Sequence, residues 1–331
     1  MQGSSSPDEV LTFARRLADG GVNALNVGIG WHESPVPTVQ QMVPHGIWVR
    51  YAAAIKNAAG ELPVIVSNRI NTMALADEVI ASGAADFVSM ARPFLADAEI
   101  VSKSKRGEAA LVDTCIACNQ ACIDRSLIDE PVSCMVNPRA GRELDFPERR
   151  TAAPRRFAVV GGGPAGMECA RALAALGHRV ELFEAENELG GQFRMARRIP
   201  GKAEFGETIR YFTNELSRLG VAVHLNTPVH DAQMLRSFDG VVLATGVLPQ
   251  EITLRGRDLS HVIDYAQLLA QDAPTGERVA ILGAGGIGVD VAHFLATVKR
   301  MRARRLDFST NRVWPHPTTA QCSSPRVRPL R

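Results

Sequence analysis

Four cysteines lie close together in the chain. Cys115, Cys118, Cys122 and Cys134 have the spacing C-x2-C-x3-C-x11-C. Three thiols on one tight loop, with a fourth returning from a nearby turn, suit a compact iron–sulfur cluster because each iron needs one soft ligand. The pattern favours a [4Fe–4S] cluster. A structural zinc site, which usually uses paired C-x2-C knuckles, and thiols without a shared role stay open as alternatives.

A glycine-rich turn follows a predicted strand at 157–160. Gly161 permits a tight turn, Gly163 lets the backbone approach a pyrophosphate, and Gly166 lets the next helix pack closely. Glu184 ends the strand after that helix, where a carboxylate can accept both ribose hydroxyls. The arrangement predicts an adenine dinucleotide site for FAD or NAD(H), since a turn that serves only packing does not explain Glu184.

A second glycine turn repeats the pattern later in the chain. Gly283, Gly285 and Gly288 follow a predicted strand at 279–282. Two such turns are typical of flavoproteins that bind two dinucleotides, with FAD at the first and a pyridine nucleotide at the second. No acidic or arginine residue that would distinguish NAD from NADP can be placed after it. We therefore expect an incomplete NAD(P)-binding unit.

Three polar residues follow predicted strands in the first 110 residues. They are His32, Arg69 and Arg92. In β/α barrels, residues beyond the carboxyl ends of strands line the active site. His32 could exchange a proton near neutral pH, and the arginines could contact a phosphate or the electron-rich edge of a flavin. A histidine that only hydrogen-bonds its loop, and salt bridges at a rim, remain alternative readings.

The elements that would position these residues alternate between helix and strand. Ser6 and Glu9 form a predicted capping box for a helix that continues to about Asp19. Strands are expected at 22–27, 63–68 and 86–90, with a helix at 74–82 before the last. Their nearly continuous apolar runs indicate parallel strands that are buried on both faces. Three strands cannot close a barrel of eight, so this part would be a piece of a (β/α)8 barrel.

We divide the α/β chain into five parts. They are a partial (β/α)8 FMN and substrate barrel at 1–110, a [4Fe–4S] segment and linker at 111–150, a Rossmann-like FAD domain at 151–255, the start of an NAD(P) domain at 256–296, and a basic tail at 297–331. Regular structure is expected to end at about Ala296. The tail is predicted to be disordered, either as a basic arm for nucleic acid or as unselected sequence after a frameshift.

Composition excludes few classes of protein. The 331 residues are 46% hydrophobic and 22% charged, with a net charge of +2, which gives no nucleic-acid signal. No apolar run reaches the roughly 18 residues of a membrane span, and no secretion signal is recognised. We expect a cytoplasmic protein, in which crowded cysteines favour a metal or cluster site over disulfides. Cys169 is predicted to be a packing residue, and Cys322 has no evident role.

Several runs of sequence resemble one enzyme family. Residues 28–33, 67–71 and 90–97 look like the last third of an FMN barrel of the old-yellow-enzyme type. Residues 115–122 and 133–138 look like the cluster segment of bacterial 2,4-dienoyl-CoA reductase (NADPH) and of its relative trimethylamine dehydrogenase. Residues 161–166, 189–193 and 199–202 continue the match. The run Trp31-His32-Glu33 favours the dienoyl-CoA branch, an enzyme of fatty acid beta-oxidation.

The resemblance implies an electron relay from NADP(H) through FAD and the [4Fe–4S] cluster to FMN, which reduces a conjugated C=C bond. It implies that His32 is the catalytic histidine and that Glu33, Ser34, Pro35 and Val36 form the substrate loop. It implies FMN contacts at Arg69, Ala91 and Arg92. It implies FAD contacts at Gln120, Ala165, Glu184, Gln192, Lys202 and Val229. The substrate would be an acyl-CoA or another activated alkene, with no nucleic acid or membrane as a partner.

The chain departs from the family at both ends. The first barrel strands, with the family's tyrosine proton donor, and most of the NADPH domain have no counterpart. We therefore expect a fragment, truncated at both ends, that holds FAD and a cluster but reduces dienoyl-CoA poorly or not at all. The alternatives are a non-catalytic remnant, or an electron-transfer module for a partner flavoprotein. A partner chain that completes the barrel is a possible partner, and the sequence does not tell whether one exists.

Overall fold

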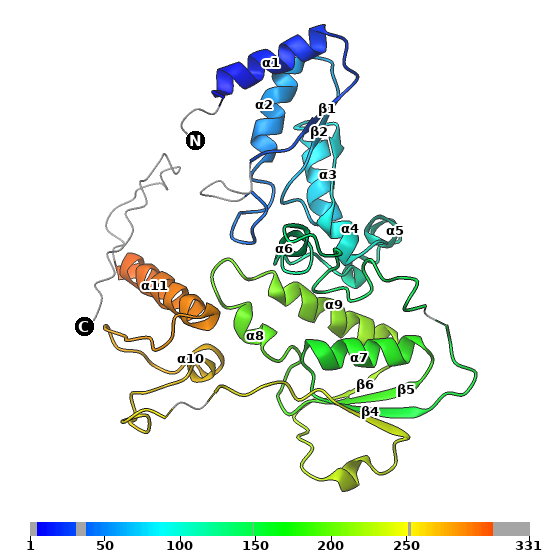
Figure 1. The fold of residues 1–331 in the computed structure, drawn as a ribbon, viewed down its shortest axis with the longest axis vertical. Coiled ribbons are helices and arrows are strands. Elements are labelled where there is room, and N and C mark those ends of the chain that lie inside the picture. Colours follow the sequence, from blue (N-terminus) through cyan, green and yellow to red (C-terminus); the bar gives the residue numbers. More distant parts are fainter. Residues whose placement is uncertain (1–4, 31–37, 148, 251–252, 307–331) are drawn as a thin grey trace. The chain divides into compact units, whose positions relative to one another are not determined.

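The computed structural model describes residues 5–30, 38–147, 149–250 and 253–306, with side chains described up to residue 298. The chain divides into two compact units between Ala280 and Ile281, and each is described by itself. The first unit contains two parallel sheets, of three and four strands (Figure 1). Within the described residues, no helix is long and apolar enough to cross a bilayer.

The three-stranded sheet is built from β/α units and has the order β1-β2-β3, with both pairs parallel. Its strands are β1 (Leu25–Val27), β2 (Val64–Val66) and β3 (Phe87–Val88). The helices of this part are α1 (Pro7–Asp19), α2 (Val49–Ala59), α3 (Met73–Ala81), α4 (Arg92–Ala96) and α5 (Ile100–Lys105). The predicted capping box is confirmed, because Ser6 Oγ accepts from the Glu9 N–H and Glu9 accepts from the Ser6 N–H.

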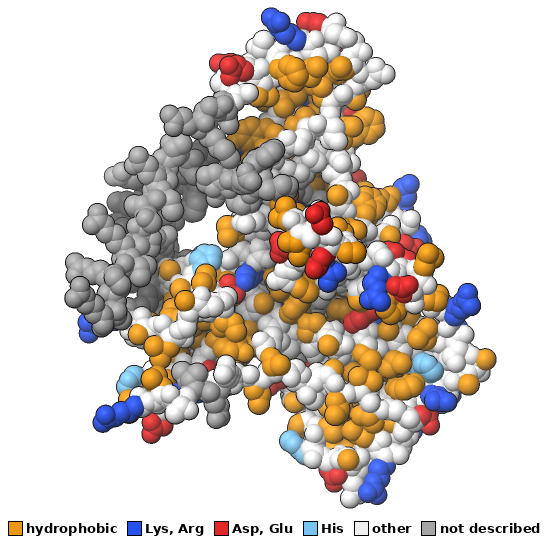
Figure 2. All heavy atoms as spheres, in the orientation of Figure 1, with side chains coloured by type: hydrophobic (Ala, Val, Ile, Leu, Met, Phe, Trp, Pro, Cys, Tyr) orange, Lys and Arg blue, Asp and Glu red, His pale blue; other side chains and the backbone are white. Residues whose placement is uncertain are grey.

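Two predictions for this sheet are wrong in detail. The first strand begins at Leu25 instead of Val22. The third strand is not buried on both faces, because the Phe87 side chain is 58% exposed. The physical reason is position, since β3 is an edge strand among the described residues. Figure 2 shows hydrophobic side chains at the surface of this part of the chain.

The segment between the two sheets has little regular structure. It contains the short 3-10 turn η1 (Ala109–Leu111) and the four-residue helix α6 (Ile123–Ser126). The loss of periodicity that the sequence shows here is therefore confirmed. All four cysteines of the predicted cluster lie in this segment or at its edges, and each is a free thiol.

The four-stranded sheet has the strand order β6-β5-β4-β7, and every pair is parallel. Its elements are β4 (Arg156–Val160), α7 (Pro164–Ala175), β5 (Arg179–Phe183), α8 (Phe193–Ala196), α9 (Phe205–Arg218), β6 (Ala222–His224), η2 (Ala232–Leu235), β7 (Gly240–Leu243) and α10 (Tyr265–Gln271). The chain adds strands on one side of β4 and then returns to its other side. Ligands of open α/β sheets bind at such a switch point, beyond the carboxyl ends of the strands.

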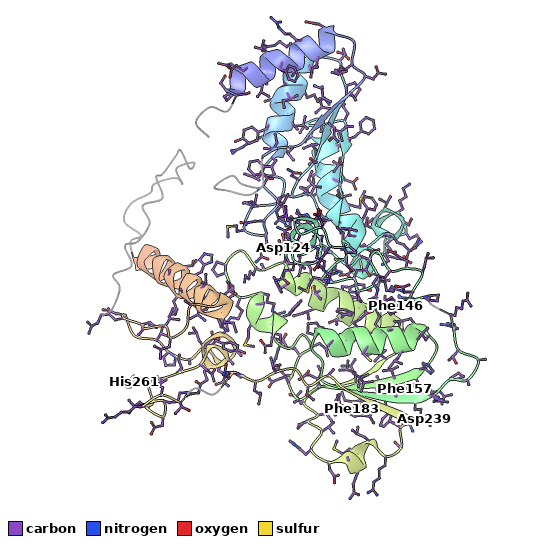
Figure 3. The ribbon with its side chains drawn as sticks, viewed as in Figure 1. Asp124, Phe146, Phe157, Phe183, Asp239 and His261 are labelled. Atoms are coloured by element: carbon purple, nitrogen blue, oxygen red, sulfur yellow. The ribbon has the colours of Figure 1, made fainter. Side chains whose placement is uncertain are left out.

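The core of this part lies between one face of the sheet and the helices α7 and α9. Val159 and Leu182 are fully buried there, together with Met167 of α7 and Leu216 of α9. Phe183 is on the opposite face of the sheet (Figure 3). Its ring stacks on that of His224. Cys169 packs against the core cluster, as predicted. This packing therefore fixes the carboxyl ends of β4 and β5 relative to the start of α7.

The second unit differs from its prediction. The expected strand at 279–282 is not formed, because a strand needs a neighbour to hydrogen-bond and no described residues provide one. The helix after the glycine turn is present as α11 (Gly286–Leu306). It continues well beyond Ala296, so the expected end of regular structure is also wrong.

Candidate cluster site and dinucleotide site

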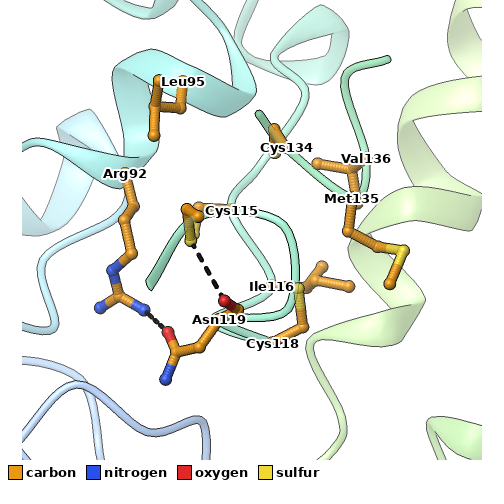
Figure 4. Close-up of a pocket in the computed structure, with 10 residues that line it drawn as sticks. Arg92, Leu95, Cys115, Ile116, Cys118, Asn119, Cys134, Met135 and Val136 are labelled. Atoms are coloured by element: carbon orange, nitrogen blue, oxygen red, sulfur yellow. Dashed lines mark hydrogen bonds between the residues drawn. The ribbon is translucent and has the colours of Figure 1, made fainter. Parts of the chain in front are cut away.

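The four cysteines line a single pocket. The other six residues that line the pocket are mainly apolar, and all ten lining residues lie between positions 92 and 136 (Figure 4). Ala117 and Asn119 have positive φ angles of 51° and 64°, which fold the loop tightly between its thiols. The Ala117 N–H points to Cys115 Sγ at 3.4 Å. Backbone N–H groups gathered in this way form a concavity that attracts negative charge, as in many iron–sulfur sites.

Side-chain amides fix this loop to the three-stranded part of the chain. Asn71, which follows β2 and is almost fully buried, donates from Nδ2 to the Cys115 carbonyl oxygen at 2.9 Å. Asn137 donates from Nδ2 to the Leu95 carbonyl oxygen in α4 at 2.9 Å. The two arms of the cysteine segment also meet each other, since the Ser133 N–H donates to the Ala121 carbonyl oxygen.

A small hydrophobic core lies beside the thiols. Its buried members are Ala96, Ile116 and Val136. Phe193 of α8 and Phe205 of α9 pack against it, with their rings edge to face at 4.8 Å between centroids. Three separate stretches of the chain therefore meet in the core beside the cysteine pocket: the β/α part, the cysteine segment and the dinucleotide part.

Arg210 of α9 holds the loop segment 110–114, which precedes the first cysteine, in place. Its guanidinium donates to the carbonyl oxygens of Ala110 at 2.6 Å and Val112 at 2.8 Å. It also donates to Thr114 Oγ1 at 3.2 Å. This arginine was not identified from the sequence, because nothing in the local pattern of α9 points to a partner about a hundred residues away.

Burial sets the acidity of the thiols. It raises the pKa of Cys115 and Cys118, and it raises the pKa of Cys134 to about 11. The charge of Arg92 acts in the opposite direction on Cys115 and Cys118. Thiolates are the form that binds metals, so loading this pocket must release protons.

The donor set fits the predicted cofactor. Within the part of the chain that the structure describes, no group of three or more His, Cys, Asp or Glu side chains is placed to hold one metal ion. Four thiols around one concavity, with N–H groups turned toward it, are the donors that a multinuclear cluster takes. Cys115, Cys118, Cys122 and Cys134 would hold it.

The first glycine turn has the geometry that its sequence predicts. Gly161 has a φ of 109°, and a Cβ there would lie under 3.0 Å from the Ala244 carbonyl oxygen. A Cβ on Gly166 would collide with the carbonyl oxygen of Gly161. Gly163 is different, because the nearest atom to its Cβ would be Gly191 Cα at 3.9 Å. Space is therefore left beside Gly163, at the start of α7, where a pyrophosphate would approach.

Glu184 lies beside this turn, as predicted, and is 8% exposed. One carboxylate oxygen accepts from the Gly162 N–H at 2.6 Å, and the other accepts from the Glu186 N–H at 2.9 Å. The carboxylate is thus held by the backbone at the carboxyl end of β5. Its contact with a ribose stays a prediction.

The other predicted FAD residues come from several loops. Gln192 donates from Nε2 to the Val247 carbonyl oxygen at 3.1 Å, which links it to the loop after β7. Ala165 is exposed in the first turn of α7, and Gln120 is exposed on the cysteine loop. Lys202 and Val229 are half-buried. Their roles stay predictions.

Arg69 is buried in a charged network instead of pointing to solvent. It donates to Glu204 Oε1 at 2.5 Å and to the Val43 carbonyl oxygen at 2.6 Å. His45 also bonds to Glu204. Burial alone would raise the pKa of Glu204, but the hydrogen bonds from His45 and Arg69 outweigh it and hold that pKa below its usual value. Glu204 was missed from the sequence, as its partners are distant in the chain.

The remaining predicted site residues divide into two groups. Ala91 and Arg92 lie at the start of α4, directly after β3. The catalytic and substrate residues fall outside the described residues: His32, Glu33, Ser34, Pro35 and Val36. The structure therefore brings the cysteines, Arg92 and the first glycine turn into one unit, and it says nothing of the substrate loop.

The second glycine turn is formed, but no described strand lies beside it. Gly283 has a φ of 108°, and a Cβ on Gly288 would lie under 3.0 Å from the Gly283 carbonyl oxygen. A Cβ on Gly283 or Gly285 would meet nothing within 4 Å. The turn therefore has the predicted local shape, no strand among the described residues lies beside it, and NAD(P) binding there stays a prediction.

Comparisons with known proteins identify the chemistry of the chain's relatives. Residues 155–308 match the model of the family described as "Pyridine nucleotide-disulphide oxidoreductase". The chain is 37% identical over 301 residues to a metal reductase of Desulforamulus reducens, covering 89% of this chain and 45% of that protein. It is 32% identical over 298 residues to a cinnamate reductase of Clostridium sporogenes, covering 87% and 43%.

Two solved structures have the same fold over most of the chain. A 2-naphthoyl-CoA reductase in complex with 2-naphthoyl-CoA matches with a TM-score of 0.86 and 31% identity, covering 90% of this chain and 46% of that one. A histamine dehydrogenase from Rhizobium sp. 4-9 matches with a TM-score of 0.72 and 24% identity, covering 88% and 44%. The chain is thus related to bacterial oxidoreductases, and it spans about half the length of the curated relatives that it matches.

Proposed function

We propose that this chain is the FAD- and cluster-binding part of a reductase that acts on a conjugated C=C bond, with electrons from NADP(H). The observation that carries the proposal is the place of the cysteine pocket: the small core beside its thiols contains Ala96 of α4, and Phe193 and Phe205 of the dinucleotide part pack against that core. A pocket next to both parts suits a one-electron carrier between two flavins. When bound, FAD would supply hydride acceptance, the [4Fe–4S] cluster single-electron transfer, and FMN hydride delivery.

The residues of this chain would bind and orient these groups. The N–H groups at the start of α7 and the open space beside Gly163 would receive the FAD pyrophosphate. The buried carboxylate of Glu184 would bind the adenine ribose, and it disfavours a cofactor with a 2′-phosphate at this turn. Arg92, half-buried after β3, would meet FMN. Arg210 would keep the cysteine loop in place through the 110–114 backbone.

The substrate class is proposed from similar proteins. Among the relatives are a cinnamate reductase and a 2-naphthoyl-CoA reductase, which are named for an unsaturated acid and an aromatic thioester. We propose an enoyl- or dienoyl-CoA, or a comparable activated alkene, for the protein to which this chain belongs. His32 would provide a proton and residues 33–36 would contact the substrate.

A second candidate is an electron-transfer module that reduces a partner or an external acceptor. It is favoured by one observation: the cysteine pocket and the first glycine turn are both formed in the described residues, while the β/α part has a sheet of three strands. A metal reductase is also among the relatives.

The two candidates separate in one experiment. The chain is purified and reconstituted without oxygen, and NADPH or NADH is added while flavin and cluster absorption are recorded. Bleaching of both, followed by reduction of a dienoyl-CoA or cinnamate at any measurable rate, supports the reductase. Bleaching with electron transfer to ferric citrate and no measurable reduction of an alkene supports the module. A colourless chain without iron contradicts both and indicates a non-catalytic remnant.

A further inference from the structure

Arg92 links the β/α part to the cysteine pocket. It is the first residue of α4, in the short connection after β3, and the family resemblance implies that it contacts FMN. Its Nη1 donates to Asn119 Oδ1 at 2.6 Å and to the Val39 carbonyl oxygen at 2.9 Å. Asn119 lies between the second and third cysteines of the loop, facing Arg92 (Figure 4). Its φ of 64° makes the loop turn sharply at this point.

Arg92 is also the one charged side chain among the described residues that line the pocket. Apart from the four thiols and Asn119, the lining consists of Leu95, Ile116, Met135 and Val136. A charge acts more strongly across an apolar, water-poor space than across water.

We propose that Arg92 is a positioning and potential-setting residue for the cysteine-bound cluster, in addition to its predicted contact with FMN. This inference rests on the proposed function, because it requires that the pocket holds a cluster. When the cluster accepts one electron, from reduced FAD in the enzyme or from dithionite in a titration, its net charge becomes more negative by one. A fixed guanidinium charge nearby favours that reduced state.

The hydrogen bond and the charge make different predictions, so they can be separated. Arg92→Lys keeps the charge and loses the planar guanidinium that reaches Asn119. Arg92→Gln keeps an N–H donor and loses the charge. Asn119→Gly removes the hydrogen-bond acceptor but keeps the positive φ, which glycine adopts without strain. Arg106→Gln, which removes an exposed arginine outside the pocket, is the matched control.

The test uses the full chain, reconstituted without oxygen with iron and sulfide. The midpoint potential of the cluster is measured by dithionite titration followed by EPR, and cluster loss is timed with an iron chelator. Arg92→Gln is expected to shift the potential to more negative values. Arg92→Lys and Asn119→Gly are expected to keep the wild-type potential but to lose the cluster about tenfold faster, as is typical when a residue that supports metal ligands is removed. Arg106→Gln should change neither property.

Each outcome decides between the proposals. If the wild type holds a cluster and Arg92→Gln leaves its potential unchanged, the inference about Arg92 is wrong while the proposed function stands. If Arg92→Lys shifts the potential as much as Arg92→Gln does, the charge is not the cause and the proposed electrostatic role is wrong. If the wild type takes up no iron, the proposed function itself fails. Circular dichroism of each variant shows that it is folded, and the lysine variant remains informative if the glutamine variant is not.

Discussion

The two glycine turns of this chain have nearly the same local shape in very different surroundings. Gly161 and Gly283 have φ angles of 109° and 108°, and in both turns the last glycine lies against the carbonyl oxygen of the first. Directly before the first turn, Val160 is 9% exposed, whereas Leu282 directly before the second turn is 67% exposed. The glycine pattern therefore specifies the conformation of the turn. The strands around it determine whether the turn becomes part of a dinucleotide-binding site.

This contrast explains which turn is expected to bind a cofactor. The first turn lies at the switch point of a four-stranded sheet and has Glu184 beside it on the next strand. The second turn leads into α11 and has no strand beside it among the described residues. A dinucleotide site uses the turn for the pyrophosphate and an acidic or comparable group on the neighbouring strand for the ribose. On the described part of the chain, only the first turn has both.

The largest predicted difference comes from the same substitution in both turns. Gly161→Ala should lower the free energy of unfolding by about 4 kcal/mol and abolish FAD binding, because the new Cβ would collide with the Ala244 carbonyl oxygen at a positive φ. Gly283→Ala meets open space and should cost only about 1 kcal/mol of backbone strain. Urea unfolding and the FAD content of each variant measure this. Equal effects in the two turns would show that the sheet around Gly161 does not matter.

A somewhat smaller effect is expected at the buried ion pair of the first unit. Glu204→Ala leaves the buried Arg69 without its carboxylate and should destabilise the chain by about 3 kcal/mol. Glu188→Ala, which removes an exposed partner of Arg197, is the control and should cost at most about 1 kcal/mol. Thermal unfolding of both variants tests this comparison, and similar costs at the two positions would contradict the account of Arg69.

The buried thiols of the first unit predict a pH effect on stability. Burial raises the pKa of Cys134 to about 11 from a value of 9.0, so the folded state holds this proton more tightly than the unfolded state does. Its contribution to stability is complete below pH 9 and is lost as the pH rises toward 11. Between these pH values, the cluster-free wild type should lose about 1–2 kcal/mol more stability than Cys134→Ala does.

Urea titrations of both cluster-free proteins at several pH values measure this difference. The two curves should run apart between pH 9 and 11 and stay parallel below pH 9. Parallel curves over the whole range would mean that the thiol is as hydrated in the folded chain as in the unfolded one.

The smallest effect on stability is expected at Gly163. Because its Cβ would have ordinary van der Waals room, Gly163→Ala should change the free energy of unfolding by less than about 1 kcal/mol. It should still weaken FAD binding by about tenfold or more, since the methyl group would occupy the approach of the pyrophosphate. Flavin fluorescence titration measures the affinity, with Gly206→Ala in α9 as the control. Unchanged affinity would place the cofactor elsewhere.

The sequence predicted local features well. The capping box of Ser6 and Glu9, the parallel β/α units, the shape of both glycine turns and the position of Glu184 are all confirmed. Each depends on residues that are near in the chain or on a pattern with a known geometric meaning. The convergence of the four cysteines on one pocket agrees with their spacing.

Contacts between distant parts of the chain could not be predicted. The bonds of Arg210 to the backbone before the cysteines, and of Glu204 to Arg69, join residues that no local pattern connects. The exposed side chain of Phe87 and the missing strand before Gly283 have the same cause. In both places the local sequence is typical of a strand. Whether the strand forms, and how far its side chains are buried, depends on neighbouring strands that the local sequence does not reveal.

The central claim is that the four cysteines of this chain hold a [4Fe–4S] cluster beside a FAD site. The most direct measurement is the iron, acid-labile sulfide and FAD content per chain after reconstitution without oxygen and removal of unbound cofactors. The account predicts about four irons, about four sulfides and about one FAD. A chain that retains FAD but binds a single zinc ion, or no metal at all, would contradict it.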